Sequence, residues 1–182
     1  MMLKTAFSLP WRVRPLTVAD VPGVQRVQAA CYGDEFIESS EVFVRRLAVP
    51  HQCSIAWVRD GDAGLYAYAV AYWSTLGKVT PLNGDFTAPE STGQLLYLHD
   101  VSVLPLLSGQ GVARHLCDTL FAQARARGVA QTALVSVQGS QSYWRRQGFR
   151  PYPLTDSRQQ ENLSTYGSDA IYMLRTASEL IR

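Results

Sequence analysis

The sequence predicts one domain of the α+β class, and three observations lead to this prediction. Short segments rich in apolar and β-favouring residues are bounded by glycine and proline, which favours strands. Helical patterns separate some of these segments and turn residues separate others, so the order mixes crossovers with hairpins, and strands modestly outnumber helices. The chain contains no internal repeat and no linker, so we expect a single domain over residues 1–182.

The segment from residue 11 to residue 49 predicts an edge strand and two helices. A strand at 11–14 alternates apolar and basic residues. Thr17 and Asp20 then form a capping-box pattern at the start of a helix that ends near Gly33. A polar connection leads to a second predicted helix at 41–49, which a proline closes.

A hairpin and a long connection follow. The hairpin joins strands at 53–58 and 65–73 through turn residues at 59–62. The second strand is apolar almost throughout, which predicts a central position covered on both faces. The connection at 74–93 is unusually long and contains several glycines and prolines, so it is either a functional loop or a disordered excursion.

The stretch from Leu95 to Gly128 carries the main chemical signal. A strand over Leu95–Val103 is stopped by a proline and followed by a glycine-containing loop at 108–113. A helix at 111–127 begins at once, so free backbone N–H groups at its N-terminus follow the strand directly. This order of strand, glycine loop and helix predicts a cradle for a pyrophosphate.

The last third of the chain predicts a strand at 132–137, a short helix at 140–147, and strands at 149–152 and 170–174. Residues 155–168, between the last two strands, are polar and are expected to be an exposed connection.

Composition excludes several classes of protein. Hydrophobic residues make up 47% of the chain, as in globular proteins, and the net charge of +2 gathers no dense basic patch of the kind that binds nucleic acid. The three cysteines form no CxxC pair, which fits a reduced cytoplasmic protein, and the three histidines lack the spacing of metal ligands. Because no apolar run could span a bilayer and the N-terminus lacks a signal-peptide core, we expect no membrane association.

Two segments combine in a fixed order: VSVLPLLSGQGVARHL at 101–116, and SQSYWRRQGF at 140–149 one strand later. Together they resemble the GCN5-related N-acetyltransferase (GNAT) superfamily, which binds acetyl-CoA. The first resembles that family's strand and its Q/R-x-x-G-x-G/A loop, although Ser108 stands where Arg or Gln is usual, and the second resembles its aromatic-R-x-x-GF segment. The resemblance implies a single GNAT-type domain with a central, mixed, mostly antiparallel twisted sheet of about six to seven strands, flanked by helices on both faces.

The resemblance implies acetyl-CoA as co-substrate and no metal. The pyrophosphate would lie on the glycine loop and the first turn of the helix, and the pantetheine arm would pair with the backbone of the strand. The implied acetyl-CoA-binding residues are Val101, Ser102, Val103, Ser108, Gly109, Gln110, Gly111, Val112, Ala113, Arg114, Trp144, Arg145 and Arg146.

A finer resemblance is to the arylalkylamine N-acetyltransferases. Their corresponding strand carries two histidines two residues apart, and here Tyr97 occupies the first position and His99 the second. The segment at 35–38 also resembles the early substrate-side region of that branch. This implies direct acetyl transfer to the primary amine of a small molecule. A protein or peptide N-acetyltransferase and a non-catalytic acyl-CoA-binding module are the alternatives.

His99 is the predicted base or proton relay, because imidazole titrates near neutral pH; the alternative is a structural histidine. Asp100 lies in an apolar strand and needs a partner, so it either anchors a neighbouring element or holds the ammonium group. On a regular strand Asp100 would point away from the face that Tyr97 and His99 share, unless a bulge intervenes.

The general acid is left open by the sequence. Trp144 stands where the family commonly has a tyrosine, and an indole N–H is no acid at neutral pH. The candidates are Tyr143, Tyr97 and Tyr172, or departure of the thiolate without a dedicated acid. The sequence does not determine the acceptor amine, nor whether the protein is a monomer or a homodimer.

Overall fold

The computed structural model describes residues 10–90 and 93–177, which form seven strands and five α-helices. The strands are β1 (Trp11–Pro15), β2 (Ile55–Arg59), β3 (Leu65–Ser74), β4 (Leu95–Val103), β5 (Gln131–Ser136), β6 (Arg150–Pro151) and β7 (Ile171–Thr176). The helices are α1 (Val21–Cys31), α2 (Ser40–Leu47), α3 (Val112–Ala126), α4 (Gln141–Arg146) and α5 (Ser157–Ser164). Short 3-10 turns lie at Val18–Asp20, Asp34–Phe36 and Pro105–Leu107.

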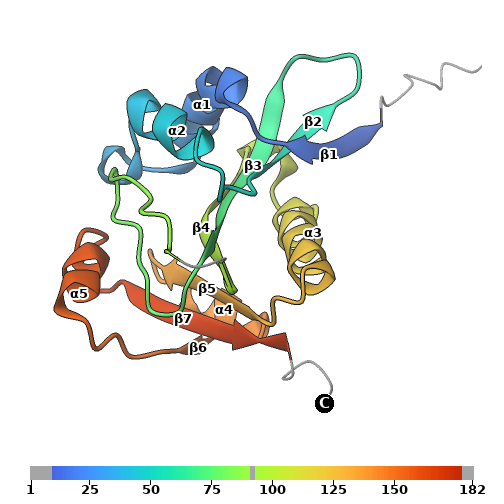
Figure 1. Ribbon diagram of the computed structural model, residues 1–182. Coiled ribbons are helices and arrows are strands. Elements are labelled where there is room, and N and C mark those ends of the chain that lie inside the picture. The colour runs from blue at the N-terminus through green and yellow to red at the C-terminus, as the bar shows by residue number, and fades with distance from the viewer. Residues whose placement is uncertain (1–9, 91–92, 178–182) are drawn as a thin grey trace, which may run out of the picture.

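All seven strands join one sheet in the order β1-β2-β3-β4-β5-β7-β6 (Figure 1). Strands β4 and β5 run parallel, and the other five neighbouring pairs run antiparallel. Helices α1 and α2 cover one face and α3 covers the other (Figure 1). This confirms the predicted class, a mixed and mostly antiparallel sheet with helices on both faces.

Strand β3 lies in the centre of the sheet, as its apolar sequence predicts. Alternate residues point to opposite faces, so Tyr68 and Tyr72 pack under α1 and α2, in one of the two core clusters. Alanines at 67, 69 and 71 face α3 in the other cluster, where their small side chains let the helix approach the sheet closely. Both faces of β3 are therefore buried.

Strand β4 is irregular at His99. Asp100 pairs with Val70 of β3 and Leu98 pairs with Ala71, so His99 is an extra residue in a β-bulge. The bulge resets the alternation of the strand. Asp100 consequently points to the face that carries Tyr97 and His99, the outcome that a regular strand would exclude.

Helix α5 lies in the connection at 155–168, which the sequence predicts to be polar and exposed. Most of these residues are exposed, as predicted, but the sequence does not predict the helix. Asp156 caps the helix by accepting a hydrogen bond from the Gln159 N–H (3.0 Å), and Tyr166 behind it is buried. The helix has almost no apolar side chains, so its sequence shows no hydrophobic periodicity from which a helix could be predicted.

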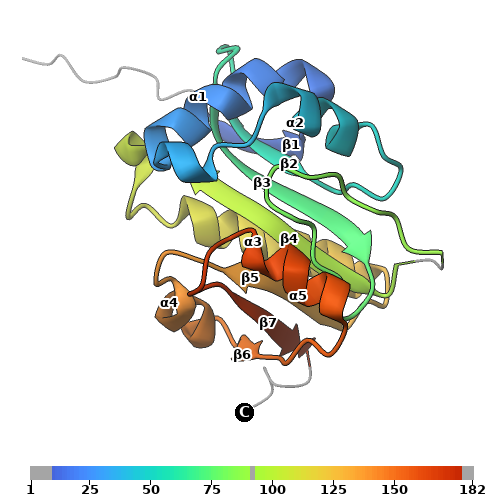
Figure 2. The ribbon, with the colours of Figure 1, turned by 90° about the vertical axis from the view of Figure 1, so that its left-hand side faces the viewer.

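The polar side chains of α5 hold the backbone of the connection between β3 and β4, which lies over the same face as α2 and α5 (Figure 2). Gln159 accepts from the Val79 N–H (2.8 Å) and Asn162 donates to the Val79 carbonyl (2.9 Å). Thr165 and Tyr166, just after the helix, bond the next backbone groups of the connection, the Leu82 N–H (2.9 Å) and the Thr80 carbonyl (2.6 Å). We call this set of contacts the α5 clamp.

No helix in residues 10–90 and 93–177 is both long and apolar enough to cross a membrane. The same two ranges contain no group of three or more His, Cys, Asp or Glu side chains that could hold a metal ion. The prediction of no signal peptide concerns residues 1–9, and part of the long connection falls on residues 91–92; both lie outside the described residues.

Candidate active site

A cavity of about 280 Å³ opens where β4 and β5 separate. The two strands pair from Leu95 to Leu98 of β4, and β4 then runs on through Val101–Val103 without β5 beside it. A ligand with amide groups could pair with this exposed strand edge. We call this space the splay cavity, and its walls include Tyr32, Leu98, His99, Asp100, Val101, Ala113, Val135, Ser140, Tyr143 and Trp144.

The loop at 108–113 turns directly into α3 beside this cavity. Gly111 is the N-cap of the helix and has φ +80°, and Gly109 has φ +74°. Both angles lie in the left-handed region that glycine adopts without a Cβ clash, so the turn requires glycine at these two positions.

The N–H groups of this loop divide into two sets. Those of Ser108 and Gln110 donate to carbonyls earlier in the same turn (3.0 and 3.3 Å). Those from Gly111 to Arg114 are the four that an α-helix leaves without an intrahelical acceptor. The second set can donate to a phosphate, and Ala113 itself lines the splay cavity.

A buried charged cluster surrounds His99 on the α1 side of β4. His99 Nε2 lies 2.9 Å from Glu38 Oε2 and 2.8 Å from Arg46 Nη1. The side chains of Glu38, Arg46 and His99 are 3%, 0% and 2% exposed. At the other edge of the ring, Nδ1 lies 3.4 Å from the Tyr166 hydroxyl. The imidazole is thus held by charged groups at one nitrogen and faces a hydroxyl at the other.

Arg46 joins three segments of the chain through one guanidinium. Its Nε donates to the Gly84 carbonyl (2.8 Å), Nη2 donates to the Pro81 carbonyl (3.0 Å), and Nη1 donates to Glu38 Oε2 (2.8 Å). The Asn83 N–H adds a bond to Glu38 Oε1 (2.8 Å). Residues 81–84 of the long connection are therefore part of the site, and the buried charges are paired as their burial requires.

The pKa of Glu38 reflects this pairing. Burial alone would raise the pKa of its carboxyl, but the charges and hydrogen bonds of His99 and Arg46 outweigh burial and hold the pKa well below its ordinary value of 4.5.

Acid is expected to remove the stabilisation that ionised Glu38 provides. Since its folded-state pKa lies below the unfolded value of 4.5, the contribution is fully present above that pH and is lost as the pH falls further. Glu38→Gln has no carboxyl to protonate, so its free energy of unfolding should fall less steeply below pH 4.5 than that of the wild type. Urea unfolding between about pH 7 and pH 3 measures both slopes. Parallel curves would contradict the expectation.

Asp100 accepts hydrogen bonds from three hydroxyl groups. Tyr32 and Tyr68 each donate at 2.5 Å and Ser102 donates at 3.1 Å. Tyr32 is the C-cap residue of α1, so Asp100 anchors that helix to the sheet, which is one of its two predicted roles. Asp100 also lines the splay cavity.

A smaller cavity of about 40 Å³ shares part of its wall with the splay cavity. Tyr32, His99, Asp100, Val135 and Val137 belong to both. We call it the inner cavity, and its remaining lining residues are Phe36, Glu38, Leu82 and Tyr166. Its walls are mainly apolar and aromatic, with the imidazole and the Asp100 carboxylate at the junction of the two spaces.

Two further cavities, of about 310 and 480 Å³, lie where the long connection meets α5 and the segment before it, and Lys78 and Gln159 line both. They are larger than the splay cavity, yet they contain none of the predicted site residues. The chemistry that the sequence predicts converges on the splay cavity, so we place the candidate active site there.

The structure separates the tyrosines that the sequence leaves open as acids. Tyr143 and Trp144 both line the splay cavity, with their rings in edge contact. Tyr97 is buried in the core and lines neither the splay cavity nor the inner cavity, and its hydroxyl has no partner within the described residues. The Tyr172 hydroxyl accepts from the Gly77 N–H (3.1 Å), outside both cavities.

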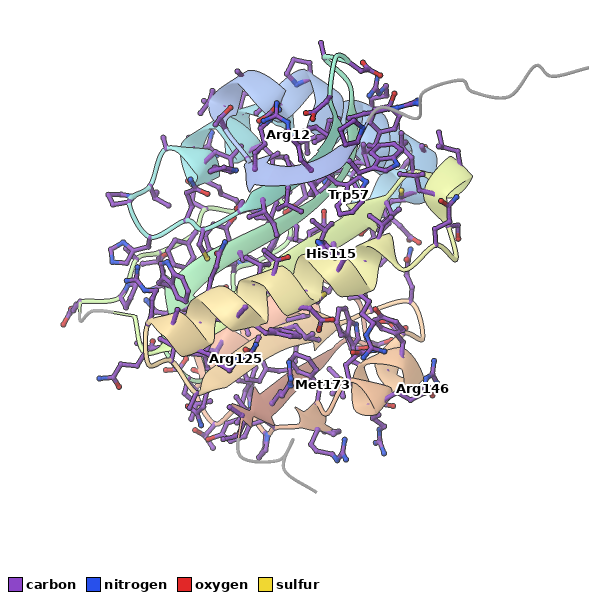
Figure 3. The ribbon with its side chains drawn as sticks, turned by 90° about the vertical axis from the view of Figure 1, so that its right-hand side faces the viewer. Arg12, Trp57, His115, Arg125, Arg146 and Met173 are labelled. Atoms are coloured by element: carbon purple, nitrogen blue, oxygen red, sulfur yellow. The ribbon has the colours of Figure 1, made fainter. Side chains whose placement is uncertain are left out.

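The predicted basic residues lie at the surface. Arg145 and Arg146 are exposed in the last turn of α4, and Figure 3 shows Arg146 on this helix near the N-terminal end of α3. Arg114, in the first turn of α3, forms a long ion pair with Asp118 (3.6 Å). Arg114 and Arg146 therefore lie near the loop at 108–113.

Sequence reasoning missed Arg46 and Tyr166. It placed Glu38 only within the segment at 35–38 that resembles a substrate-side region, and it assigned this residue no role. Arg46 had a usable signal, because it falls three and four residues after Phe43 and Val42, on the buried stripe of α2. Tyr166 lies 67 residues from His99 in sequence, and nothing local indicates their contact.

A model of the acetyltransferase (GNAT) family matches residues 22–149. The chain belongs to the GNAT family. The matched segment contains β4, the loop at 108–113, α3 and α4, and therefore every residue that the sequence predicts for catalysis and acetyl-CoA binding except the alternative acid Tyr172. A search among curated proteins found no match.

Solved structures share the GNAT fold over most of this chain. The ribosomal-protein-S18-alanine N-acetyltransferase from Escherichia coli is 18% identical, with a TM-score of 0.66 over 92% of this chain and 94% of that one. PaiA N-acetyltransferase from Thermoplasma acidophilum, in complex with coenzyme A, is 14% identical, with a TM-score of 0.62 over 92% and 99%. A GNAT family acetyltransferase from Brucella melitensis, in complex with acetyl-CoA, is 21% identical, with a TM-score of 0.54 over 79% and 84%. At these identities the likeness concerns the fold.

Proposed function

We propose that this protein is an acetyl-CoA-dependent N-acetyltransferase that acetylates the primary amine of a small molecule. The observation that carries the proposal is the junction of the splay cavity and the inner cavity at His99 and Asp100. A base and a carboxylate lie between a space suited to the acyl donor and a space suited to the acceptor.

The splay cavity suits acetyl-CoA, which would supply an acetyl thioester there. Val101–Val103 offer a free strand edge to the amide groups of a pantetheine arm. The N–H groups at the start of α3 suit the pyrophosphate. The positive φ angles at 109 and 111 require glycine, and Gly109 and Gly111 have no side chain that would obstruct the phosphates. Arg145 and Arg146 are placed for further phosphate contacts, with Trp144 in the wall.

The acceptor chemistry falls to His99 and Asp100. An amine is protonated near neutral pH, so Asp100 attracts the ammonium group and His99 takes the proton that the nitrogen must lose before attack. The nitrogen then forms the new bond to the acetyl carbon, the carbon–sulfur bond breaks, and the nitrogen releases its second proton as the thiolate leaves. One proton therefore ends on His99 and one on the sulfur, which receives it from the nitrogen directly or through an acid that the nitrogen's proton replenishes.

The inner cavity favours a small amine over a protein substrate. Its walls include the rings of Tyr32, Phe36 and Tyr166 and the side chain of Leu82, and its volume of about 40 Å³ admits only a small group. Together with the resemblance of β4 to the arylalkylamine branch, this supports an aromatic or otherwise apolar amine. The Escherichia coli protein is named for an alanine of ribosomal protein S18, so a protein N-terminus is the second candidate.

We also propose that residues 1–182 act as one domain in the cytoplasm, as a monomer or homodimer, without metal, membrane or nucleic acid. This proposal is supported by the single sheet of the described residues and by the chain's small net charge of +2.

A substrate panel tests the proposed function. The full chain is incubated with acetyl-CoA and arylalkylamines, polyamines, amino acids and peptides in turn, with CoA release and the acetylated product both measured. We expect N-acetylation of apolar primary amines. Preference for peptides would favour the second candidate, and acetyl-CoA binding without acetylation of any amine would indicate a non-catalytic binding module.

Tyr143→Phe is expected to lower kcat by about tenfold to a hundredfold with little change in fold stability. Burial raises the pKa of Tyr143, so its hydroxyl stays protonated and has a proton to give to the thiolate. Steady-state rates with the best amine measure the effect. Tyr66→Phe serves as the matched control, since Tyr66 on β3 lines neither cavity. Unchanged kcat in Tyr143→Phe would remove this residue from the mechanism, and Tyr97→Phe would then test the rival.

A further inference from the structure

His99 Nε2 has two charged neighbours, and its bonding decides which ring nitrogen can take a proton. Glu38 Oε2 lies 2.9 Å from it and Arg46 Nη1 lies 2.8 Å from it. In a neutral imidazole one nitrogen carries the hydrogen and the other accepts. Either Nε2–H donates to Glu38 and Nδ1 is the acceptor, or Arg46 donates to Nε2 and the hydrogen lies on Nδ1.

The contact with Glu38 favours the first arrangement. Without a hydrogen, the Nε2 lone pair would face a charged oxygen at 2.9 Å in a site with almost no solvent, and this contact is repulsive. With a hydrogen, the same contact is a charge-assisted hydrogen bond, the stronger kind. Four of the five Arg46 N–H groups are already used, two for the Glu38 oxygens and two for the Gly84 and Pro81 carbonyls. The fifth, on Nη1, faces Nε2 at 2.8 Å, so the first arrangement requires the bond to Glu38 to outweigh this contact.

We infer that Glu38 is the positioning residue of His99: it keeps the hydrogen on Nε2 and makes Nδ1 the nitrogen that takes the substrate proton. Arg46 supports this arrangement, because its bonds to both sides of the Glu38 carboxylate fix the carboxylate's orientation. The inference rests on the proposed function, in which His99 is the base.

The surroundings of Nδ1 stabilise its protonated form. Nδ1 lies 3.4 Å from the Tyr166 hydroxyl, whose own hydrogen is committed to the Thr80 carbonyl at 2.6 Å. The Tyr166 oxygen can therefore accept from Nδ1–H once His99 is protonated. The imidazolium formed on proton transfer is then bonded at both nitrogens, to Glu38 and to Tyr166, as a base that must carry charge in a buried site requires.

Nitrogen-15 NMR of the full chain reads the tautomer without any substrate. The His99 signals are assigned by their loss in His99→Gln, and the wild type is measured at increasing pH until these signals no longer change, when the ring is neutral. We expect a protonated Nε2 and an unprotonated Nδ1. A hydrogen on Nδ1 would overturn the inference, because Arg46 would then hold Nε2. This readout does not depend on acetylation, so it separates failure of the inference from failure of the proposed function.

The variant Glu38→Gln provides a second test of the inference. Loss of the charged acceptor is expected to move the hydrogen to Nδ1, with Arg46 donating to Nε2, and to lower kcat by about ten- to a thousandfold. Glu35→Gln, in the same segment but exposed, is the matched control and should change neither. A folded Glu38→Gln protein with the wild-type tautomer and rate would overturn the inference. Circular dichroism checks the fold, and if this variant does not fold, the wild-type tautomer decides alone.

Discussion

Replacing His99 by glutamine is expected to lower kcat/KM for amine acetylation by a factor of about 10² to 10⁴. His99 is the one histidine in the described residues that lines both the splay cavity and the inner cavity. Glutamine keeps a similar volume and one hydrogen-bonding oxygen or nitrogen for Glu38 and Arg46, but it cannot take a proton near neutral pH. Rates with the best amine of the panel, measured from about pH 6 to pH 9, give the effect.

His115→Gln is the matched control for this loss. His115 is exposed on α3, where its ring contacts Trp57 of β2 at a centroid distance of 5.1 Å (Figure 3). We expect it to keep the wild-type rate, and we expect His99→Gln to keep its affinity for acetyl-CoA in calorimetry, since no predicted phosphate contact is altered. A His99→Gln protein with full activity would assign this histidine a structural role only.

Replacing Arg46 by methionine is expected to lower the free energy of unfolding by about 3–5 kcal/mol. The substitution leaves the buried Glu38 carboxylate without its guanidinium partner and deprives the Gly84 and Pro81 carbonyls of a donor. Removing one member of a buried ion pair is costly because the other charge stays out of water. Urea unfolding followed by circular dichroism measures the loss.

The neighbouring arginine gives the matched control. Arg45 pairs with Asp85 at 2.8 Å, but their side chains are 54% and 59% exposed, so Arg45→Met should cost no more than about 1 kcal/mol. In the double variant Glu38→Gln/Arg46→Met no unpaired charge remains, and part of the stability should return. Equal losses in Arg45→Met and Arg46→Met would contradict the importance of the buried cluster.

Local sequence signals predicted the elements well because each signal is short-ranged. The apolar run of β3, the capping pattern at Thr17 and Asp20 and the glycine at the end of α3 are all read within a few residues. Helix α5 has no such signal. Its side chains bond a distant backbone segment, and a polar helix of this kind cannot be told from a loop by hydrophobic periodicity.

The candidate site was predictable on its donor side and much less so on its acceptor side. A glycine loop before a helix is a contiguous pattern, so Gly109 and Gly111 could be identified directly. The surroundings of His99 come from segments 53 to 67 residues away in sequence, at Arg46, Glu38 and Tyr166. The bulge that turns Asp100 toward His99 is a register effect between two strands, which one strand's sequence does not encode.

The α5 clamp has a consequence for how this protein could acquire new substrates. Two carboxamide side chains, Gln159 and Asn162, hold the backbone of Val79 in the way that a neighbouring strand would, and the same connection supplies Leu82 to the inner cavity. A substitution on this surface helix can therefore move an acceptor wall without breaking any hydrogen bond of the sheet. Under the proposed function, variation in the acceptor can thus accumulate on α5 while the acetyl-CoA side, on β4 and α3, stays constant.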